Sequence, residues 1–225
     1  MKKTPEEAIK LLIESKKQIL AFLKKTLDED DSLNYRTFGT NIEDYLSPEV
    51  IKIFRKGGFI KKESDYVEAP NKNHFPDFEL KTTSSLALDF KSGNRSRKTG
   101  NRWVSTNNSN NDLGTLNSWP KKIGKFGGDN IYFLFIIYNI NNKKREILDI
   151  QIDPFYKFLG LTKTGVIKYR EKDGNLRPRD FYKEPLITSK SQFCSLFKKT
   201  IMYRSEKIIK KHRKILKSTD EIVCF

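Results

Sequence analysis

The chain has 225 residues and carries 44 Lys and Arg against 28 Asp and Glu, a formal net charge of +16. With 36% hydrophobic residues it is long and apolar enough to bury the core of one domain, which we place over residues 1–225. The longest strongly apolar run, Ile131–Tyr138, is far shorter than the roughly 20 residues that span a bilayer, so an integral membrane protein is excluded, as are a collagen and a disordered tail.

The N-terminal part, residues 1–58, is predicted to be helical. Thr4-Pro5-Glu6-Glu7 combines an N-cap, a proline at the first helical position and an acid in the first turn, so a helix is expected from Thr4 to about Leu27. A second helix is expected over Ile42–Lys56, where Gly57-Gly58 ends it.

Short β-like segments follow, and they predict a catalytic sheet over residues 59–152. They are Phe59–Lys61, Asp65–Glu68, Phe78–Lys81, Leu86–Lys91, Ile131–Tyr138 and Ile147–Ile152. Between them, Ser105–Gly128 is predicted to be a long connection too polar for a core.

The last part, residues 153–225, is expected to hold a recognition loop and a basic helix. A short helix over Pro154–Leu159, a strand or hairpin arm over Lys163–Glu171 and a turn at Lys172–Asn175 precede a long helix over Ser191–Leu216. The predicted fold class is therefore α/β, with a central mixed β-sheet flanked by helices.

The positive charge indicates a polyanion partner, nucleic acid first, although a Lys-rich proteome would also decorate solvated faces with lysine. The basic residues concentrate in a loop-like tract, Lys91–Trp103, and in Lys198–Lys217. These segments lack the large apolar face of a membrane-surface helix, so no membrane partner is expected.

The N-terminus has no apolar segment of the kind that a secretion signal needs, so a cytoplasmic location is expected. Cys194 and Cys224 lie far apart, without Cys or His at metal-ligand spacing, and are interpreted as ordinary thiols.

The most specific segment runs from Pro76 to Lys91 and is predicted to form a hairpin. Its second arm alternates, so Leu86, Leu88 and Phe90 face the core while Asp89 and Lys91 share the other face. Asp77 then comes opposite Asp89. Two carboxylates without His or Cys suit a hard cation that prefers oxygen ligands, Mg²⁺ above all, and with an adjacent lysine they predict metal-assisted phosphodiester hydrolysis.

A structural interpretation competes with this one, because an acid two residues before a lysine is common. Glu14-Ser15-Lys16 and Glu79-Leu80-Lys81 are further instances in the chain. Glu79-Leu80-Lys81 is the rival register, but it lies too close to Asp77 to be its partner across a turn.

The pattern Pro76-Asp77, spacer, Asp89-Phe90-Lys91 resembles the motif of the PD-(D/E)XK nuclease superfamily, and Tyr66–Phe78 is similar to the matching region of EcoRV-like Type II restriction endonucleases. The resemblance implies a restriction-endonuclease-like core. It also implies a homodimer on palindromic double-stranded DNA, Mg²⁺-dependent and blunt hydrolysis that leaves 5′-phosphates, and a companion DNA methyltransferase.

The resemblance also implies residue roles. Asp77, Asp89 and the Phe90 carbonyl would hold Mg²⁺, and Lys91 would position the attacking water. Glu43 would help to organise the site, although it could be a solvated helix residue, and Asp44 is its rival. The helices of residues 1–58 would build the dimer contact, and the C-terminal helix would bind phosphates.

Candidate DNA contacts follow from polar and basic segments, with Asn and Arg suited to base edges and phosphates. A plain surface turn is an equally good interpretation of the stretch that begins at Gly174. The candidates are Asn71, Lys72, Asn73, Asn94, Arg95, Arg97, Lys98, Arg102, Asn107, Asn108, Gly174, Asn175, Arg177 and Arg179.

The function expected from the sequence is that of a Type II site-specific deoxyribonuclease. Two alternatives stay open, a repair or junction-resolving nuclease of the same fold and a non-catalytic basic nucleic-acid-binding protein.

Overall fold

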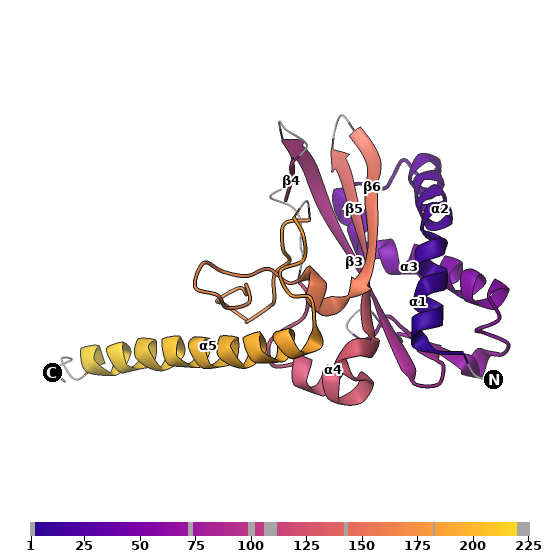
Figure 1. The fold of residues 1–225 in the computed structure, drawn as a ribbon. Coiled ribbons are helices and arrows are strands. Elements are labelled where there is room, and N and C mark those ends of the chain that lie inside the picture. Colours follow the sequence, from indigo (N-terminus) through magenta and orange to yellow (C-terminus); the bar gives the residue numbers. More distant parts are fainter. Residues whose placement is uncertain are drawn as a thin grey trace.

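The computed structural model describes residues 3–71, 74–98, 102–105, 112–141, 144–181 and 183–219. Three N-terminal helices cover one face of a central sheet, and the later part of the chain covers the other (Figure 1). In chain order the helices and strands are α1 (Pro5–Glu14), α2 (Lys16–Glu29), α3 (Tyr35–Lys56), β1 (Tyr66–Glu68), β2 (Phe78–Lys81), β3 (Ser85–Lys98), β4 (Arg102–Ser105), α4 (Trp119–Phe126), β5 (Ile131–Asn141), β6 (Lys144–Pro154) and α5 (Lys190–Thr219).

The first helix begins with the predicted capping box. The amide of Thr4 donates to Glu7 Oε2 at 2.7 Å, and the amide of Glu7 donates to Thr4 Oγ1 at 3.3 Å. The single helix expected to reach Leu27 is instead divided into α1 and α2. Ser15, a weak helix former, lies between them with ψ at 2°, outside the helical range.

Helix α3 begins seven residues earlier than predicted, at Tyr35 instead of Ile42. The reason is a second N-terminal cap. The amide of Asn34 donates to Thr37 Oγ1 at 2.8 Å, and the amide of Thr37 donates back to Asn34 Oδ1 at 3.2 Å. The cap therefore starts the helix at Tyr35, and the added part contributes Phe38 to the core.

The five main strands form one mixed sheet in the order β1-β2-β3-β5-β6. Neighbouring strands are antiparallel except for β3 and β5, which are parallel. The additional strand β4 pairs with the far end of β3.

The strand predicted over Phe59–Lys61 is wrong. The amides of Phe59 and Ile60 donate to the carbonyl of Phe54, at 2.8 and 3.4 Å, and the amide of Lys61 donates to Asp65 Oδ2 at 2.8 Å. The first two amides are used in the turn that ends α3 and the third is used by the Asp65 side chain, so none of them is left for a sheet.

The tract Lys91–Trp103, expected to be a loop, is strand wherever the structure describes it. Residues 91–94 pair with Phe135–Tyr138 of β5, and residues 95–98 pair with β4. Backbone pairing with an apolar neighbouring strand does not require apolar side chains, which explains the error.

The sheet is buried on both faces. Leu86, Leu88 and Phe90 of β3 share one core with residues of α1, α2 and α3, as the alternation predicted. Ala87 of the same strand belongs to a second core with Phe133 and parts of α4 and α5. The face of β3 that carries Asp89 and Lys91 is therefore largely covered.

The second core also corrects the prediction for Ser105–Gly128. Its described part, residues 112–128, contains α4 and four fully buried apolar side chains, Leu113, Leu116, Trp119 and Phe126. These four side chains belong to the second core, so the segment forms part of its wall.

The C-terminal region leads from the sheet to a long helix. Phe155–Phe158 forms a short 3-10 helix close to the predicted helix, and Lys163–Glu171 forms isolated bridges of a hairpin arm. Helix α5 packs Phe193 and Phe197 onto the second core and then extends away from the body (Figure 1). No helix in the described ranges is long and apolar enough to cross a membrane.

Candidate active site

The antiparallel pairing of β2 with β3 brings the motif residues together. Phe78 lies opposite Leu88, so Asp77, one residue earlier, falls opposite Asp89 where the two strands leave the hairpin. Both carboxylates are buried, with 4% and 3% of the residue exposed. The predicted juxtaposition is confirmed.

The side-chain ammonium of Lys91 lies at the centre of this group. Its Nζ is 2.7 Å from Asp89 Oδ2 and 4.0 Å from Asp77 Oδ2, and it donates to the carbonyl of Phe90 at 3.2 Å. Asp77 is held in turn by the amide of Phe90, which donates to its Oδ2 at 2.5 Å. The oxygens expected to bind a metal therefore surround one position, where the Lys91 ammonium lies.

This donor set fits a hard divalent cation. It consists of two carboxylates and one backbone carbonyl, which suits Mg²⁺ because that ion completes its shell with water and phosphate oxygens. Within the described residues, no group of three or more His, Cys, Asp and Glu side chains is arranged to hold a metal. A third protein ligand would thus come from the Phe90 carbonyl.

The rival register is placed farther along the same strand. Glu79 accepts a hydrogen bond from Ser85 Oγ at 2.8 Å and pairs with Lys125 at 3.3 Å, and Lys81 is exposed. The Glu79 carboxylate is therefore bound to Ser85 and Lys125 and not to Asp77 or Asp89.

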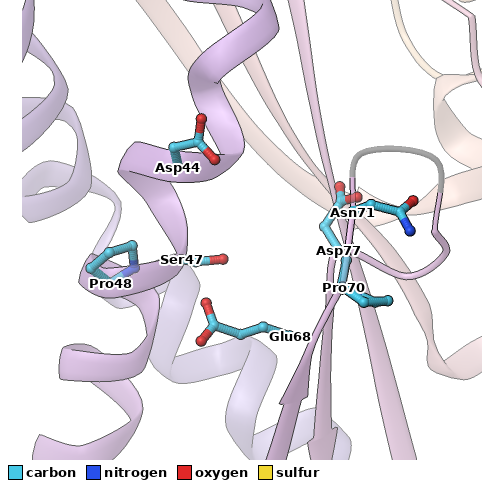
Figure 2. A pocket seen from close by; sticks show the side chains of 8 residues that line it. Asp44, Ser47, Pro48, Glu68, Pro70, Asn71 and Asp77 are labelled. Carbon is cyan, nitrogen blue, oxygen red and sulfur yellow. The ribbon is translucent and has the colours of Figure 1, made fainter.

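A pocket opens beside Asp77, between α3 and the segment that follows β1 (Figure 2). Asp44 and Ser47 line it from the helix, and Glu68 and Asn71 line it from the strand side. The rival residue Asp44 is therefore placed on this pocket. Glu43 lies in α3, and its side chain is outside the described part of the chain.

Sequence reasoning missed a second lysine near the motif. Lys122 lies on α4 at helical spacing from the buried Trp119, and its ammonium is 3.7 Å from the centre of the Phe75 ring. The pKa of Lys122 is lowered, mainly because burial disfavours the charged form. Asp89 and Asp77 act in the opposite direction, and Lys91 lowers the pKa further. The spacing of Trp119, Lys122 and Phe126 was the available signal, hidden in a segment taken for a polar connection.

Several candidate DNA contacts cannot be placed. Lys72, Asn73, Asn107 and Asn108 lie outside the described residues. The backbones of Arg95, Arg97, Lys98 and Arg102 belong to β3 and β4, but their side chains are outside the described part. Asn71 lines the pocket beside Asp77.

Asn94, expected at a DNA surface, has a structural position. Its side chain is buried, with Nδ2 donating to the carbonyl of Ile140 and Oδ1 accepting from the amide of Ile140, both at 3.2 Å. A buried polar side chain has to satisfy its hydrogen bonds within the protein. These two hydrogen bonds do so, and they link β3 to β5.

The stretch that begins at Gly174 is a packed turn. Gly174 has φ of +74°, and Asn175 forms an isolated bridge with Thr115. Arg177 forms an ion pair with Asp112 and remains about one-third exposed. These contacts hold the predicted recognition loop against the segment that precedes α4.

Arg179, another candidate for base contact, is buried. Its guanidinium donates to the carbonyls of Lys157 at 2.7 Å and Asp180 at 3.1 Å, and to Gln151 Oε1 at 3.3 Å. A guanidinium used in this way is not displayed to DNA, so this placement differs from the sequence expectation.

Comparison with known proteins supports the architecture. No protein-family model and no curated protein sequence matches the chain. Among solved structures, the chain is similar to the NlaIV restriction endonuclease, with a TM-score of 0.53 and 16% sequence identity over 80% of this chain and 75% of that chain. The predicted fold class, an α/β restriction-endonuclease-like core, is thereby confirmed.

Proposed function

We propose that the protein is a Mg²⁺-dependent endonuclease that hydrolyses phosphodiester bonds in double-stranded DNA. The observation that carries the proposal is the position of Lys91 Nζ among Asp89 Oδ2, Asp77 Oδ2 and the Phe90 carbonyl. The restriction-endonuclease-like fold and the net charge of +16 support it.

Asp77, Asp89 and the Phe90 carbonyl would hold Mg²⁺. When bound, the ion would polarise the phosphate and promote ionisation of the attacking water. The oxygen of that water bonds to phosphorus while the bond from phosphorus to the 3′-oxygen breaks, which leaves a 5′-phosphate and, after proton uptake, a 3′-hydroxyl.

The residues of the chain would orient this reaction. The Phe90 amide fixes Asp77, so its carboxylate is set before the substrate arrives. Lys91 would position the attacking water and offset the negative charge that develops on the phosphate. Glu43 would complete the outer part of the site, and its rival for this role is Asp44, which lies on the adjoining pocket.

The finer proposal is a Type II restriction endonuclease of EcoRV-like type. It would act as a homodimer on a palindromic site, cut bluntly and accompany a DNA methyltransferase. Helices α1 to α3 would make the dimer contact and α5 would bind phosphates. This version rests on the Asp77 to Lys91 motif, together with the similar region over Tyr66–Phe78.

The test is digestion of a plasmid of known sequence with Mg²⁺, with Ca²⁺ and with a chelator, followed by sequencing of the ends. We expect discrete fragments from the wild type with Mg²⁺ only, and none from Asp89→Ala or Lys91→Met. Lys81→Met is the matched control, because Lys81 belongs to the rival motif and is exposed. Equal cutting by Asp89→Ala and the wild type would remove the proposed site.

Substrate choice separates the alternatives. Cutting confined to branched or mismatched DNA would indicate a repair or junction-resolving nuclease. Metal-independent binding with a steep salt dependence and no product would indicate a non-catalytic binding protein.

A further inference from the structure

Helix α4 carries a lysine on its core-facing side. Trp119, Lys122 and Phe126 lie at i, i+3 and i+7, so they share one face of the helix. Trp119 and Phe126 are buried in the second core, and Lys122 between them is partly buried. A lysine in this position is directed towards the sheet that holds Asp89 and Lys91.

The surroundings of the Lys122 ammonium are aromatic. Its Nζ lies 3.7 Å from the centre of the Phe75 ring and 5.0 Å from that of Trp119, distances at which a cation is attracted to the ring face. Gly114, with φ of +88°, forms a third side, and a Cβ there would be only 3.2 Å from Nζ. Phe75 precedes Pro76-Asp77, so this cradle adjoins the motif directly.

Within the described residues, no carboxylate lies within 4.0 Å of Lys122 Nζ. The neighbouring lysines of α4 differ, because Lys125 pairs with Glu79 at 3.3 Å and Lys121 is exposed. Aromatic rings hold an ammonium in place without neutralising it, so its charge stays available to an anion. The lowered pKa of Lys122 agrees with this partly dehydrated position, and the charges that act on it are those of Asp89, Lys91 and Asp77.

We propose that Lys122 binds a non-bridging oxygen of the DNA phosphate that is cut. The inference rests on the proposed nuclease function and adds a second cationic contact to Lys91. Hydrolysis increases the negative charge on the phosphate oxygens, and a cation preset in a partly dehydrated cradle stabilises that charge without reorganising. Lys122 would thus act as a catalytic residue through direct contact with substrate.

The test compares Lys122→Met, Lys122→Arg and, as the matched control on the same helix, Lys121→Met. Methionine keeps an apolar side chain of similar shape among the rings and removes the ammonium group. We expect Lys122→Met to lower the single-turnover cleavage rate by about 10²-fold, the scale found when one preorganised donor is lost. Lys122→Arg should keep most of the rate, and Lys121→Met should keep all of it.

A second readout needs no metal. Duplex binding by each variant is measured at several salt concentrations without divalent ions. Affinity falls as salt rises, and each lost phosphate contact should make the slope of log affinity against log salt shallower by about 0.9. We expect the slope to become shallower by this amount for each subunit that carries Lys122→Met, and to stay unchanged for Lys121→Met. Thermal melting checks that Lys122→Met remains folded at the assay temperature.

The outcomes separate this inference from the proposed function. If Lys91→Met is inactive while Lys122→Met cuts at the wild-type rate with an unchanged salt slope, the inference is overturned and the nuclease function stands. A parallel fall in stability and rate, with the salt slope unchanged, shows a packing role and also overturns it. A wild type that cuts no duplex under any divalent ion defeats both.

Discussion

Lys91 Nζ lies 2.7 Å from Asp89 Oδ2, and the side chain of Asp89 is only 5% exposed. Replacing Lys91 with methionine would leave Asp89 and Asp77 as buried carboxylates without this cation. Breaking a buried pair by removing one partner costs about 3–5 kcal/mol, and we expect about 2–3 kcal/mol because Lys91 is 24% exposed. Urea unfolding at pH 7 without divalent ions measures this loss.

The same experiment has an internal control. Lys81→Met removes an exposed lysine from the next strand and should change the unfolding free energy by less than about 0.5 kcal/mol. Adding Asp89→Asn to Lys91→Met should recover part of the loss. Equal stability of Lys91→Met and the wild type would mean that the pair is not buried as described.

Binding of Mg²⁺ to the folded protein should raise its melting temperature, because a ligand that binds only the native state stabilises it. We expect the increase to be lost in the Asp77→Asn/Asp89→Asn double variant, which keeps the size of both side chains. Calorimetric melting with increasing Mg²⁺ makes the measurement without any DNA. An unchanged increase in the double variant would place the ion elsewhere.

Asn94 should prove structural. Its side chain makes both hydrogen bonds to the backbone of Ile140. Asn94→Ala should therefore lower the unfolding free energy by about 2–3 kcal/mol, because the bonds are lost at a buried position. Duplex affinity of the folded fraction should stay within about twofold of the wild type. A large loss of affinity with unchanged stability would restore the sequence interpretation of Asn94 as a DNA contact.

These residues show how far the sequence alone could reach. The alternation of Leu86, Leu88 and Phe90 was sufficient to place Asp89 and Lys91 on one face, because strand periodicity is a local property. The end of β3 was not predictable in this way, since the backbone of Asn94 is paired with Tyr138, far along the chain. Lys122 was missed for the same reason, because Phe75 and Trp119 meet around it only in the folded chain.

Helix α5 offers a test of phosphate binding away from the active site. Lys210 and Lys214 are exposed in the C-terminal half of α5. This helix extends away from the body (Figure 1). If α5 binds the DNA backbone, Lys210→Gln/Lys214→Gln should make the dependence of log affinity on log salt shallower by up to about 1.8 per subunit. Lys17→Gln/Lys24→Gln on α2, also exposed, is the matched control. Equal slopes for the two double variants would exclude α5 from the interface.

The turn at Asp173 should make stability depend on acid pH. Hydrogen bonds from Arg170 and from the amide of Asn175, the latter at 3.0 Å, hold the pKa of Asp173 well below its ordinary value. A carboxylate with a lowered pKa contributes stability that is complete above its unfolded pKa, about 4, and is lost as the pH falls towards its folded value. Asp173→Asn should thus melt below the wild type at pH 7, and the difference should narrow from pH 4 downwards.

Calorimetric melting between pH 7 and pH 2.5 follows this difference, with Asp28→Asn as the control. Asp28 is exposed on α2 and its side chain forms no hydrogen bond or ion pair with another described residue, so its replacement should leave the melting profile unchanged. Arg170 pairs with Asp112 as well as with Asp173, and Arg177 pairs with the same Asp112. Protonation of Asp173 therefore weakens one ion pair of this connected group. A constant difference between Asp173→Asn and the wild type across the whole range would show that the charge of Asp173 does not stabilise this turn.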